Sequence, residues 1–246
     1  MSRWKRSRQR DFLYRSVIKT RVELERRGAT NDTVKRVIAR PGRSNLSWLA
    51  AVYGSDKGAT AHRYGEIYER HLSDTRGTTT KVLEIGVYKG GSLKMWRDYF
   101  PGAEVIGLDI EQITVDGPRI QVLQGDQSDS ELLARIHAMG PFDLIIDDGS
   151  HFAEHIAASF EGLYSAVKPG GWYVIEDMQT AYTPSYGGGA PGTVDTSITL
   201  VQRLMDSVNR EYVAIKYPEV AAELLPVDEI HVYPKIAFMR RSVAGR

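Results

Sequence analysis

The chain has 246 residues, of which 42% are hydrophobic and 26% charged, values typical of one globular domain or of a domain with an appendage. Its formal net charge of +1 argues against general nucleic-acid binding, and the absence of cysteine excludes disulfides and thiolate metal sites. No apolar stretch approaches a membrane span, and charged residues interrupt the place where a secretory signal needs an apolar core. We therefore expect a cytoplasmic protein without a stable membrane anchor.

Residues 1–50 are strongly basic and predict a helical segment that precedes the main domain, which we expect over residues 51–246. Gly28 is expected to end the first helix, and Asn31 or Asp32 to cap a second one. The segment is either a docking arm for an anionic partner or membrane surface, or a pair of helices that pack on the domain or on another subunit. We favour packing, because runs of charge usually form solvated faces.

From residue 80 onward, apolar runs typical of strands alternate with helical patterns. The expected strands are residues 82–87, 104–110, 120–123, 143–147 and 172–175, and the expected helices are residues 92–99, a helix after the capping box at 128–131, and 151–167. Residues 229–233 and 235–240 predict a closing antiparallel hairpin. The pattern indicates an α/β fold with a doubly wound, Rossmann-like, mostly parallel seven-stranded sheet.

Ligands of open parallel sheets bind beyond the carboxyl ends of the strands. Acidic residues and a glycine gather at these ends in the predicted sheet: Glu84, Gly86, Asp109, Asp126, Asp148, Glu176 and Asp177. The convergence indicates a binding edge.

The loop after the first expected strand carries Gly86, Gly90 and Gly91, which let the backbone turn tightly and approach a ligand. Its spacing differs from the dinucleotide-binding and phosphate-binding glycine motifs. Asp109 follows at the end of the second strand, about 20 residues on, where an acid can hold ribose hydroxyls. The loop therefore favours a nucleotide-like cofactor over the alternative, a purely structural turn.

Two pairs of adjacent acids follow neighbouring strands. If the strands of Asp148 and of Glu176–Asp177 pair, their ends lie about 5 Å apart, and the three carboxylates can share one ion. Oxygen ligands favour Mg²⁺, Mn²⁺ or Ca²⁺ over zinc. Alternatively, some of these polar residues cap helices, which we expect of Asp147 or Ser150.

His151 is expected in the first turn of the next helix, where it can accept a proton beside the ion. With Glu154 and His155 it also matches a zinc-protease pattern. We reject zinc, because the pattern is short and no third ligand follows; His155 is interpreted as a packing or surface residue. Residues 182–193, rich in glycine, predict a mobile loop that covers the acceptor.

Residues 81–92, 104–109 and 125–126 resemble the cofactor motifs of class I S-adenosylmethionine-dependent methyltransferases. More narrowly, residues 83–92, 147–151 and 173–180 resemble the metal-dependent sugar O-methyltransferases of macrolide antibiotic pathways, the mycinamicin and tylosin type. The similarity covers about residues 50–240. Some members of that family carry a separate N-terminal domain, in place of which this sequence has its basic segment.

The resemblance implies roles for individual residues. S-adenosylmethionine would be bound by Glu84, Gly86, Tyr88, Gly90, Ser92, Asp109, Asp126, Gln127 and Asp147. The metal, Mg²⁺ or Mn²⁺, would be held by Asp148, Glu176 and Asp177. His151 would be the catalytic base, and Gln179 and Tyr182 would lie near the acceptor.

The function expected from this resemblance is metal-dependent methylation of a hydroxyl on a small-molecule glycoside or other natural product, as in antibiotic biosynthesis. The chain is expected to be a homo-oligomer that binds no nucleic acid. The alternative is a non-catalytic relative that binds the cofactor and acts as a scaffold through its basic segment. A scaffold needs neither the acids nor the histidine, so their presence favours the enzyme.

Overall fold

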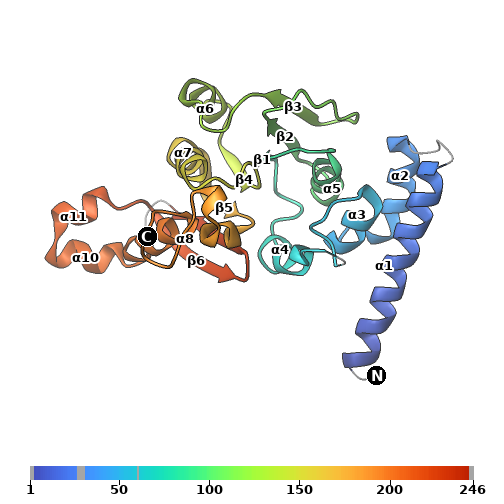
Figure 1. Ribbon diagram of the computed structural model, residues 1–246, viewed down its shortest axis with the longest axis horizontal. Coiled ribbons are helices and arrows are strands. Elements are labelled where there is room, and N and C mark those ends of the chain that lie inside the picture. The colour runs from blue at the N-terminus through green and yellow to red at the C-terminus, as the bar shows by residue number, and fades with distance from the viewer. Residues whose placement is uncertain (1–2, 27–30, 60, 244–246) are drawn as a thin grey trace. The chain divides into compact units, whose positions relative to one another are not determined.

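The computed structural model describes residues 3–26, 31–59 and 61–243 (Figure 1). The chain divides into two compact units. The N-terminal unit comprises residues 1–80, 87–106 and 113–122, and the sheet unit comprises residues 81–86, 107–112 and 123–246. Gly28, expected to end the first helix, lies outside the described residues.

One sheet contains seven strands. They are β1 (Lys81–Ile85), β2 (Glu104–Asp109), β3 (Ile120–Gln124), β4 (Phe142–Asp147), β5 (Val167–Ile175), β6 (Val227–Tyr233) and β7 (Ile236–Arg241). Their order is β3-β2-β1-β4-β5-β7-β6. β4 pairs in parallel with β1 and β5, whereas β7 is antiparallel to β5 and β6. This confirms the predicted Rossmann-like sheet with its antiparallel C-terminal hairpin.

Helices precede the sheet and connect its strands. They are α1 (Arg3–Arg26), α2 (Asp32–Ala39), α3 (Leu46–Tyr53), α4 (Tyr64–Leu72), α5 (Gly91–Tyr99), α6 (Ser130–His137), α7 (Ala153–Leu163), α8 (Ser197–Arg203), α9 (Met205–Val208), α10 (Arg210–Lys216) and α11 (Pro218–Glu223). In the part of the chain that the structure describes, none of them is long and apolar enough to cross a membrane.

In the N-terminal unit, the basic segment packs on its own chain. α1 contacts α3, and Tyr14 donates a hydrogen bond to the Asn45 side chain over 3.3 Å. Asn45 also caps α3, while Asn31 caps α2 by accepting from the amide of Val34. Of the two caps considered for the second helix, Asn31 is the one observed. Asp32 of α2 also pairs with Arg97 of α5 at 2.7 Å, a contact beyond residue 50 that supports packing, the favoured of the two interpretations of this segment.

A buried charge cluster joins α2, α3 and α5 within this unit. The fully buried guanidinium of Arg97 lies 2.7 Å from an oxygen of Asp32 and 2.9 Å from an oxygen of Asp98. Tyr53 donates a 2.5 Å hydrogen bond to Asp98, and its pKa is raised by burial and then by that bond. Each charge here has an opposite partner, which is the condition under which buried charges are tolerated.

In the sheet unit, α7 packs on β5 and contacts α6. The ring of Phe160 lies 5.1 Å from that of Tyr173 on β5, so an aromatic contact holds the helix to the strand. β4 and β5 are among the most buried strands, because helices cover parallel strands on both faces.

The structure corrects several predicted boundaries. α7 begins at Ala153, so His151 lies in the loop before the helix and not in its first turn. α6 is capped by Asp129, whose side chain accepts from the amides of Glu131 and Leu132, and not by Ser128. β5 begins at Val167 and not at residue 172, because the strand continues through Gly170 and Gly171. Helices α8–α11 were not predicted.

Candidate active site

The ends of β4 and β5 place two candidate ligands at one edge of the sheet. Asp147 pairs with Ile175 in the parallel ladder. The ladder continues past the strand ends: the amide of Asp148 donates to Ile85 over 3.0 Å, and the amide of Glu176 donates to Asp147 over 2.9 Å. The backbone therefore fixes where Asp148 and Asp177 leave the sheet.

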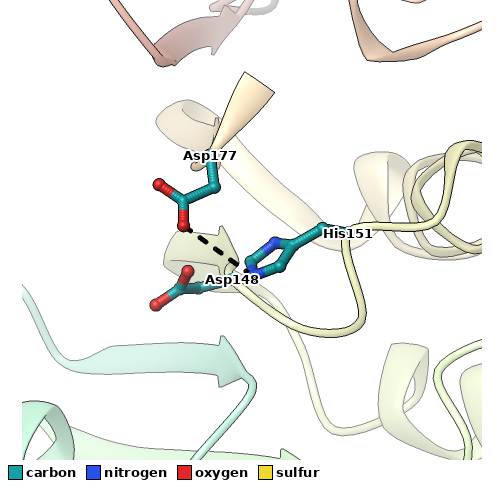
Figure 2. A group of neighbouring side chains, drawn as sticks. All are labelled: Asp148, His151 and Asp177. Atoms are coloured by element: carbon teal, nitrogen blue, oxygen red, sulfur yellow. Dashed lines mark ion pairs between the residues drawn. The ribbon is translucent and has the colours of Figure 1, made fainter. Parts of the chain in front are cut away.

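Asp148, His151 and Asp177 form a cluster in which one ligand atom of each lies within 4.8 Å of the others. Figure 2 shows the three side chains turned toward one another, Asp148 and Asp177 from the two strand ends and His151 from the loop. His151 Nε2 lies 3.8 Å from an oxygen of Asp177, and both side chains are partly exposed, at 23% and 18%. Solvent and a ligand can therefore reach them.

Two carboxylates and an imidazole, whose ligand atoms lie within 4.8 Å of one another in partly exposed positions, fit a divalent cation. Carboxylate oxygens are the protein ligands that Mg²⁺ prefers, and it usually keeps several waters, so two acids suffice. Glu176, the third acid expected to bind the ion, is 2% exposed and is not a member of the cluster. Its role as a ligand remains a prediction.

The backbone is strained where the cluster is made. His151 has φ 61° and Asp177 has φ 51°, left-handed values that cost residues with a β-carbon of order 1 kcal/mol. The amide and hydroxyl of Thr180 both donate to the carbonyl of Asp177, over 3.0 and 2.9 Å, and hold the turn. Strain that the surroundings enforce is common at functional sites, which supports this place as the active site.

Close backbone contact fixes the loop of Asp148 against β1. Gly86 has φ +90°, and a β-carbon there would lie 2.1 Å from the carbonyl oxygen of Asp148. A β-carbon at Gly149 would lie 2.1 Å from the side-chain oxygen of Gln127. Only glycine permits both approaches.

A buried network lies beneath the same loop. The Gln127 amide donates to Asp147 over 3.2 Å and to Ser159 over 2.9 Å, and its oxygen accepts from the Ser150 amide over 2.6 Å. Tyr173 donates to the other oxygen of Asp147 over 3.3 Å. Burial raises the pKa of the Asp147 carboxyl to about 7. Asp147 and Gln127 thus support the loop from inside; their predicted contact with the cofactor is untested.

The other residues predicted to bind the cofactor lie at several positions. Glu84 is fully buried within β1, and Asp109 ends β2, where its side chain accepts from the amide of Glu111. The Asp126 side chain accepts hydrogen bonds from the amide and the hydroxyl of Ser128. These hydrogen bonds lower the pKa of the Asp126 carboxyl, and the one from the amide has the largest effect. The remaining three are Tyr88, with φ 50°, Gly90, which precedes α5, and Ser92, all in the N-terminal unit.

The two residues predicted near the acceptor follow Asp177 directly, in the 3-10 helix Met178–Tyr182. Gln179 has a buried side-chain oxygen that accepts no hydrogen bond from the described residues, and Tyr182 is 53% exposed. Residues 182–193 are mostly exposed and contain the 3-10 helix Pro184–Tyr186.

The zinc pattern is not assembled. His155 Nδ1 pairs with the Ser150 hydroxyl at 3.0 Å, and His155 is outside the cluster that contains His151. The Ser150 hydroxyl also accepts a hydrogen bond from the amide of Phe152 over 3.4 Å. Ser150 therefore links the loop to the start of α7. Sequence reasoning missed Tyr186, whose ring lies 6.4 Å from that of His151. Only its place in the glycine-rich loop pointed to it.

Comparison with known proteins gives consistent results, although no protein-family model matches the chain. It is 40% identical over 225 residues to 8-demethyl-8-(2-methoxy-alpha-L-rhamnosyl)-tetracenomycin-C 3'-O-methyltransferase of Streptomyces olivaceus. The matched region covers 87% of this chain and 57% of that protein. It is 41% identical over 210 residues to mycinamicin VI 2''-O-methyltransferase of Micromonospora griseorubida, covering 80% of this chain and 52% of that protein.

The solved structure of MycE methyltransferase from the mycinamycin biosynthetic pathway, in complex with Mg, SAH and mycinamycin VI, superposes with a TM-score of 0.75 at 40% identity. The match covers 82% of this chain and 54% of that one. The chain thus spans just over half the length of these relatives. The resemblance inferred from the sequence is confirmed: the chain is a homologue of the macrolide and tetracenomycin O-methyltransferases and has the class I methyltransferase fold.

Proposed function

We propose that this protein transfers a methyl group from S-adenosylmethionine to a hydroxyl of a glycosylated small molecule, with a divalent cation at the cluster of Asp148, His151 and Asp177. The observation that carries the proposal is the meeting of these three side chains at the ends of β4 and β5. The relatives support it, since MycE binds Mg and SAH and the names of the others describe methylation of sugar-bearing compounds.

The acidic residues of the cluster are the proposed metal ligands. Asp148 and Asp177 would hold the cation through their carboxylates, with Glu176 proposed as a further ligand. A bound cation supplies Lewis-acid chemistry, which lowers the pKa of a hydroxyl that it contacts. The cluster is partly exposed, so an acceptor hydroxyl can approach it.

His151 is proposed as the base. Methyl transfer forms a bond from the hydroxyl oxygen to the methyl carbon, breaks the bond from that carbon to sulfur, and releases the hydroxyl proton. Mg²⁺ prefers oxygen ligands, so the imidazole is left to accept the proton at Nε2. The carboxylate of Asp177, 3.8 Å from Nε2, would stabilise the resulting imidazolium.

For S-adenosylmethionine, the proposed contacts are the nine residues predicted from the resemblance. In the sheet unit, Glu84 lies in β1, Gly86 follows β1, and Asp109 ends β2. The antibiotic-pathway role and the glycoside acceptor are extended to this chain from its relatives. The scaffold alternative is not favoured, because it gives no reason for the strained backbone at His151 and Asp177.

The test is mass spectrometry of a library of rhamnosides incubated with protein, S-adenosylmethionine and Mg²⁺, with calorimetry of SAH binding in parallel. We expect gain of one methyl group, abolished by excess chelator. Full turnover in chelator would refute the metal, and SAH binding without any methylation would favour the scaffold.

Assembly and location are further parts of the proposal. A homo-oligomer, with no nucleic-acid ligand, is tested by light scattering and by titration with RNA and DNA. A cytoplasmic location is tested by cell fractionation.

A further inference from the structure

A pocket of about 440 Å³ lies beside the active site, within the sheet unit. Its wall is built by the start of α7, the 3-10 helix Pro184–Tyr186 and the start of α8. The lining side chains that matter here are Phe152, Tyr186, Ser197, Leu200 and Arg203. A volume of this size matches pockets that hold small organic ligands, about 300–1,000 Å³.

The pocket shares a wall with the catalytic cluster. Tyr186 has its ring 6.4 Å from the ring of His151 and 5.5 Å from the ring of Phe152. Phe152 is the next residue after His151, and 39% of it is exposed. A ligand that presents a hydroxyl to His151 therefore has its neighbouring groups beside these two rings.

The lining combines an apolar wall with one unsatisfied hydroxyl. Phe152, Tyr186 and Leu200 supply apolar surface. Ser197 is 2% exposed, and its hydroxyl has no hydrogen-bond partner among the described residues. A buried polar group without a partner is costly, so a ligand hydroxyl that reaches it is favoured.

Helix capping does not explain Ser197. Thr196 and Thr199 form the capping box of α8, each bonding the backbone of the other. Three charged residues line the pocket: Arg203 pairs with Asp195 at 2.8 Å, and the Glu154 side chain is 83% exposed to solvent and lies 3.9 Å from His155. The pocket thus offers no unmatched charge from this pair, and favours an uncharged ligand.

We infer that this pocket binds the ring next to the one that is methylated, and that this ring is uncharged, has one apolar face and carries at least one hydroxyl. A second sugar has this chemistry: its apolar face lies on Phe152 and Tyr186, and its hydroxyl pairs with Ser197. The inference rests on the proposed function and adds the requirement that the acceptor have two rings.

The test compares methyl α-L-rhamnoside with a methyl rhamnosyl-rhamnoside disaccharide and with p-nitrophenyl α-L-rhamnoside. Binding is measured by NMR with SAH and Mg²⁺ present, and KM is measured with S-adenosylmethionine. We expect the disaccharide to bind about tenfold more tightly than the monosaccharide, and more tightly than the nitrophenyl glycoside, which has no hydroxyl on its second ring.

The pocket variants should remove this preference. Ser197→Ala is expected to weaken disaccharide binding about fivefold and Phe152→Ala about tenfold, with monosaccharide binding within twofold of the wild type. Phe152→Leu, which keeps apolar bulk, guards against misfolding, and melting temperatures are compared. Tyr212→Ala is the matched control, because Tyr212 is 75% exposed on α10 and does not line the pocket.

Equal binding of one-ring and two-ring glycosides, or variants that bind the disaccharide as the wild type does, would overturn the inference. A wild-type protein that binds none of the three also overturns it. A preference for the nitrophenyl glycoside assigns the pocket to an apolar aglycone and refutes the second sugar. Failure of the proposed function is separate: the disaccharide then binds with its preference intact, but gains no methyl group.

Discussion

Two clusters of acidic residues in this protein use similar side chains for opposite purposes. In the N-terminal unit, Asp98 lies in contact with Arg97 and Tyr53, at 2.9 and 2.5 Å, and is almost fully buried. In the sheet unit, His151 Nε2 lies 3.8 Å from an oxygen of Asp177, and both side chains are partly exposed. The first arrangement satisfies its charges internally and holds helices together, whereas the second leaves room for a ligand.

The largest expected effect tests the site half of this comparison. Asp148→Asn should lower kcat/KM by about a thousandfold, because the remaining residues hold the cation poorly, while the melting temperature changes little. Steady-state kinetics over a range of Mg²⁺ concentrations measure the loss. Asp206→Asn, which changes an exposed aspartate on α9 away from the proposed pocket, is the control and should keep more activity. An active Asp148→Asn enzyme would mean that the cluster holds no essential metal.

The opposite pattern is expected in the buried charge cluster. Arg97→Met should lower the free energy of unfolding by about 3–5 kcal/mol, because it leaves buried carboxylates without their cation. Urea denaturation measures it, and SAH binding should be retained at low temperature. Exposed Arg203→Met provides the control, with a change near zero to 1 kcal/mol. If Arg97→Met is as stable as the wild type, this cluster does not hold the unit together.

The third prediction separates the two chemical roles open to the histidine in the cluster. His151→Ala should lower kcat by about a hundredfold or more while leaving Mg²⁺ affinity within a few-fold of the wild type, as expected for a base. Calorimetric titration with Mg²⁺ and SAH measures affinity apart from turnover. A loss of affinity as large as that of Asp148→Asn would instead identify His151 as a ligand.

The smallest effect concerns the buried network beneath the site. Burial raises the pKa of Asp147 to about 7. The native state therefore holds this proton more tightly than the unfolded chain, whose aspartates titrate near 4, so the contribution to stability is present below about pH 4 and is lost as pH rises toward 7. Asp147→Asn should remove this part of the pH dependence in thermal unfolding.

Asp126 gives the matched comparison with opposite sign. The pKa of the Asp126 carboxyl is lowered in the folded protein, mainly by the hydrogen bond from the Ser128 amide. Asp126 therefore stabilises the fold above the pKa that it has in the unfolded chain, and this stabilisation is lost as pH falls through its pKa in the folded protein. Asp126→Asn should therefore flatten the acid side of the profile only. Identical profiles for the two variants would contradict both assignments.

The sequence allowed prediction of the strand ends and of the acids on them, because periodicity locates strands and parallel strands share one edge. It did not allow prediction of the conformation of His151. A left-handed φ value can be inferred from the sequence at Gly86, because only glycine fits there. It cannot be inferred at a histidine, where the surrounding contacts impose it. Periodicity predicted a helix that begins at His151, and the loop before α7 shows why that fails.

The sequence also did not reveal contacts between residues that lie far apart in the chain. The contact of Gln127 with the cofactor stays a prediction, and the structure adds that its side chain bonds to Asp147, Ser150 and Ser159, which lie far from it in the chain. The pocket likewise joins Phe152, Tyr186 and Ser197 from three separate segments. No local pattern marks such a meeting, so the structure was needed to find both.

The clearance at Gly86 has a consequence for engineering. Its missing β-carbon makes room for the carbonyl of Asp148, because a β-carbon at position 86 would lie only 2.1 Å from that carbonyl oxygen. Even alanine would push that loop away from the first strand and carry Asp148 with it. Libraries that diversify the glycine loop, which we propose contacts the methyl donor, must therefore keep position 86 invariant, because a change there would displace the neighbouring loop before any new donor was tested.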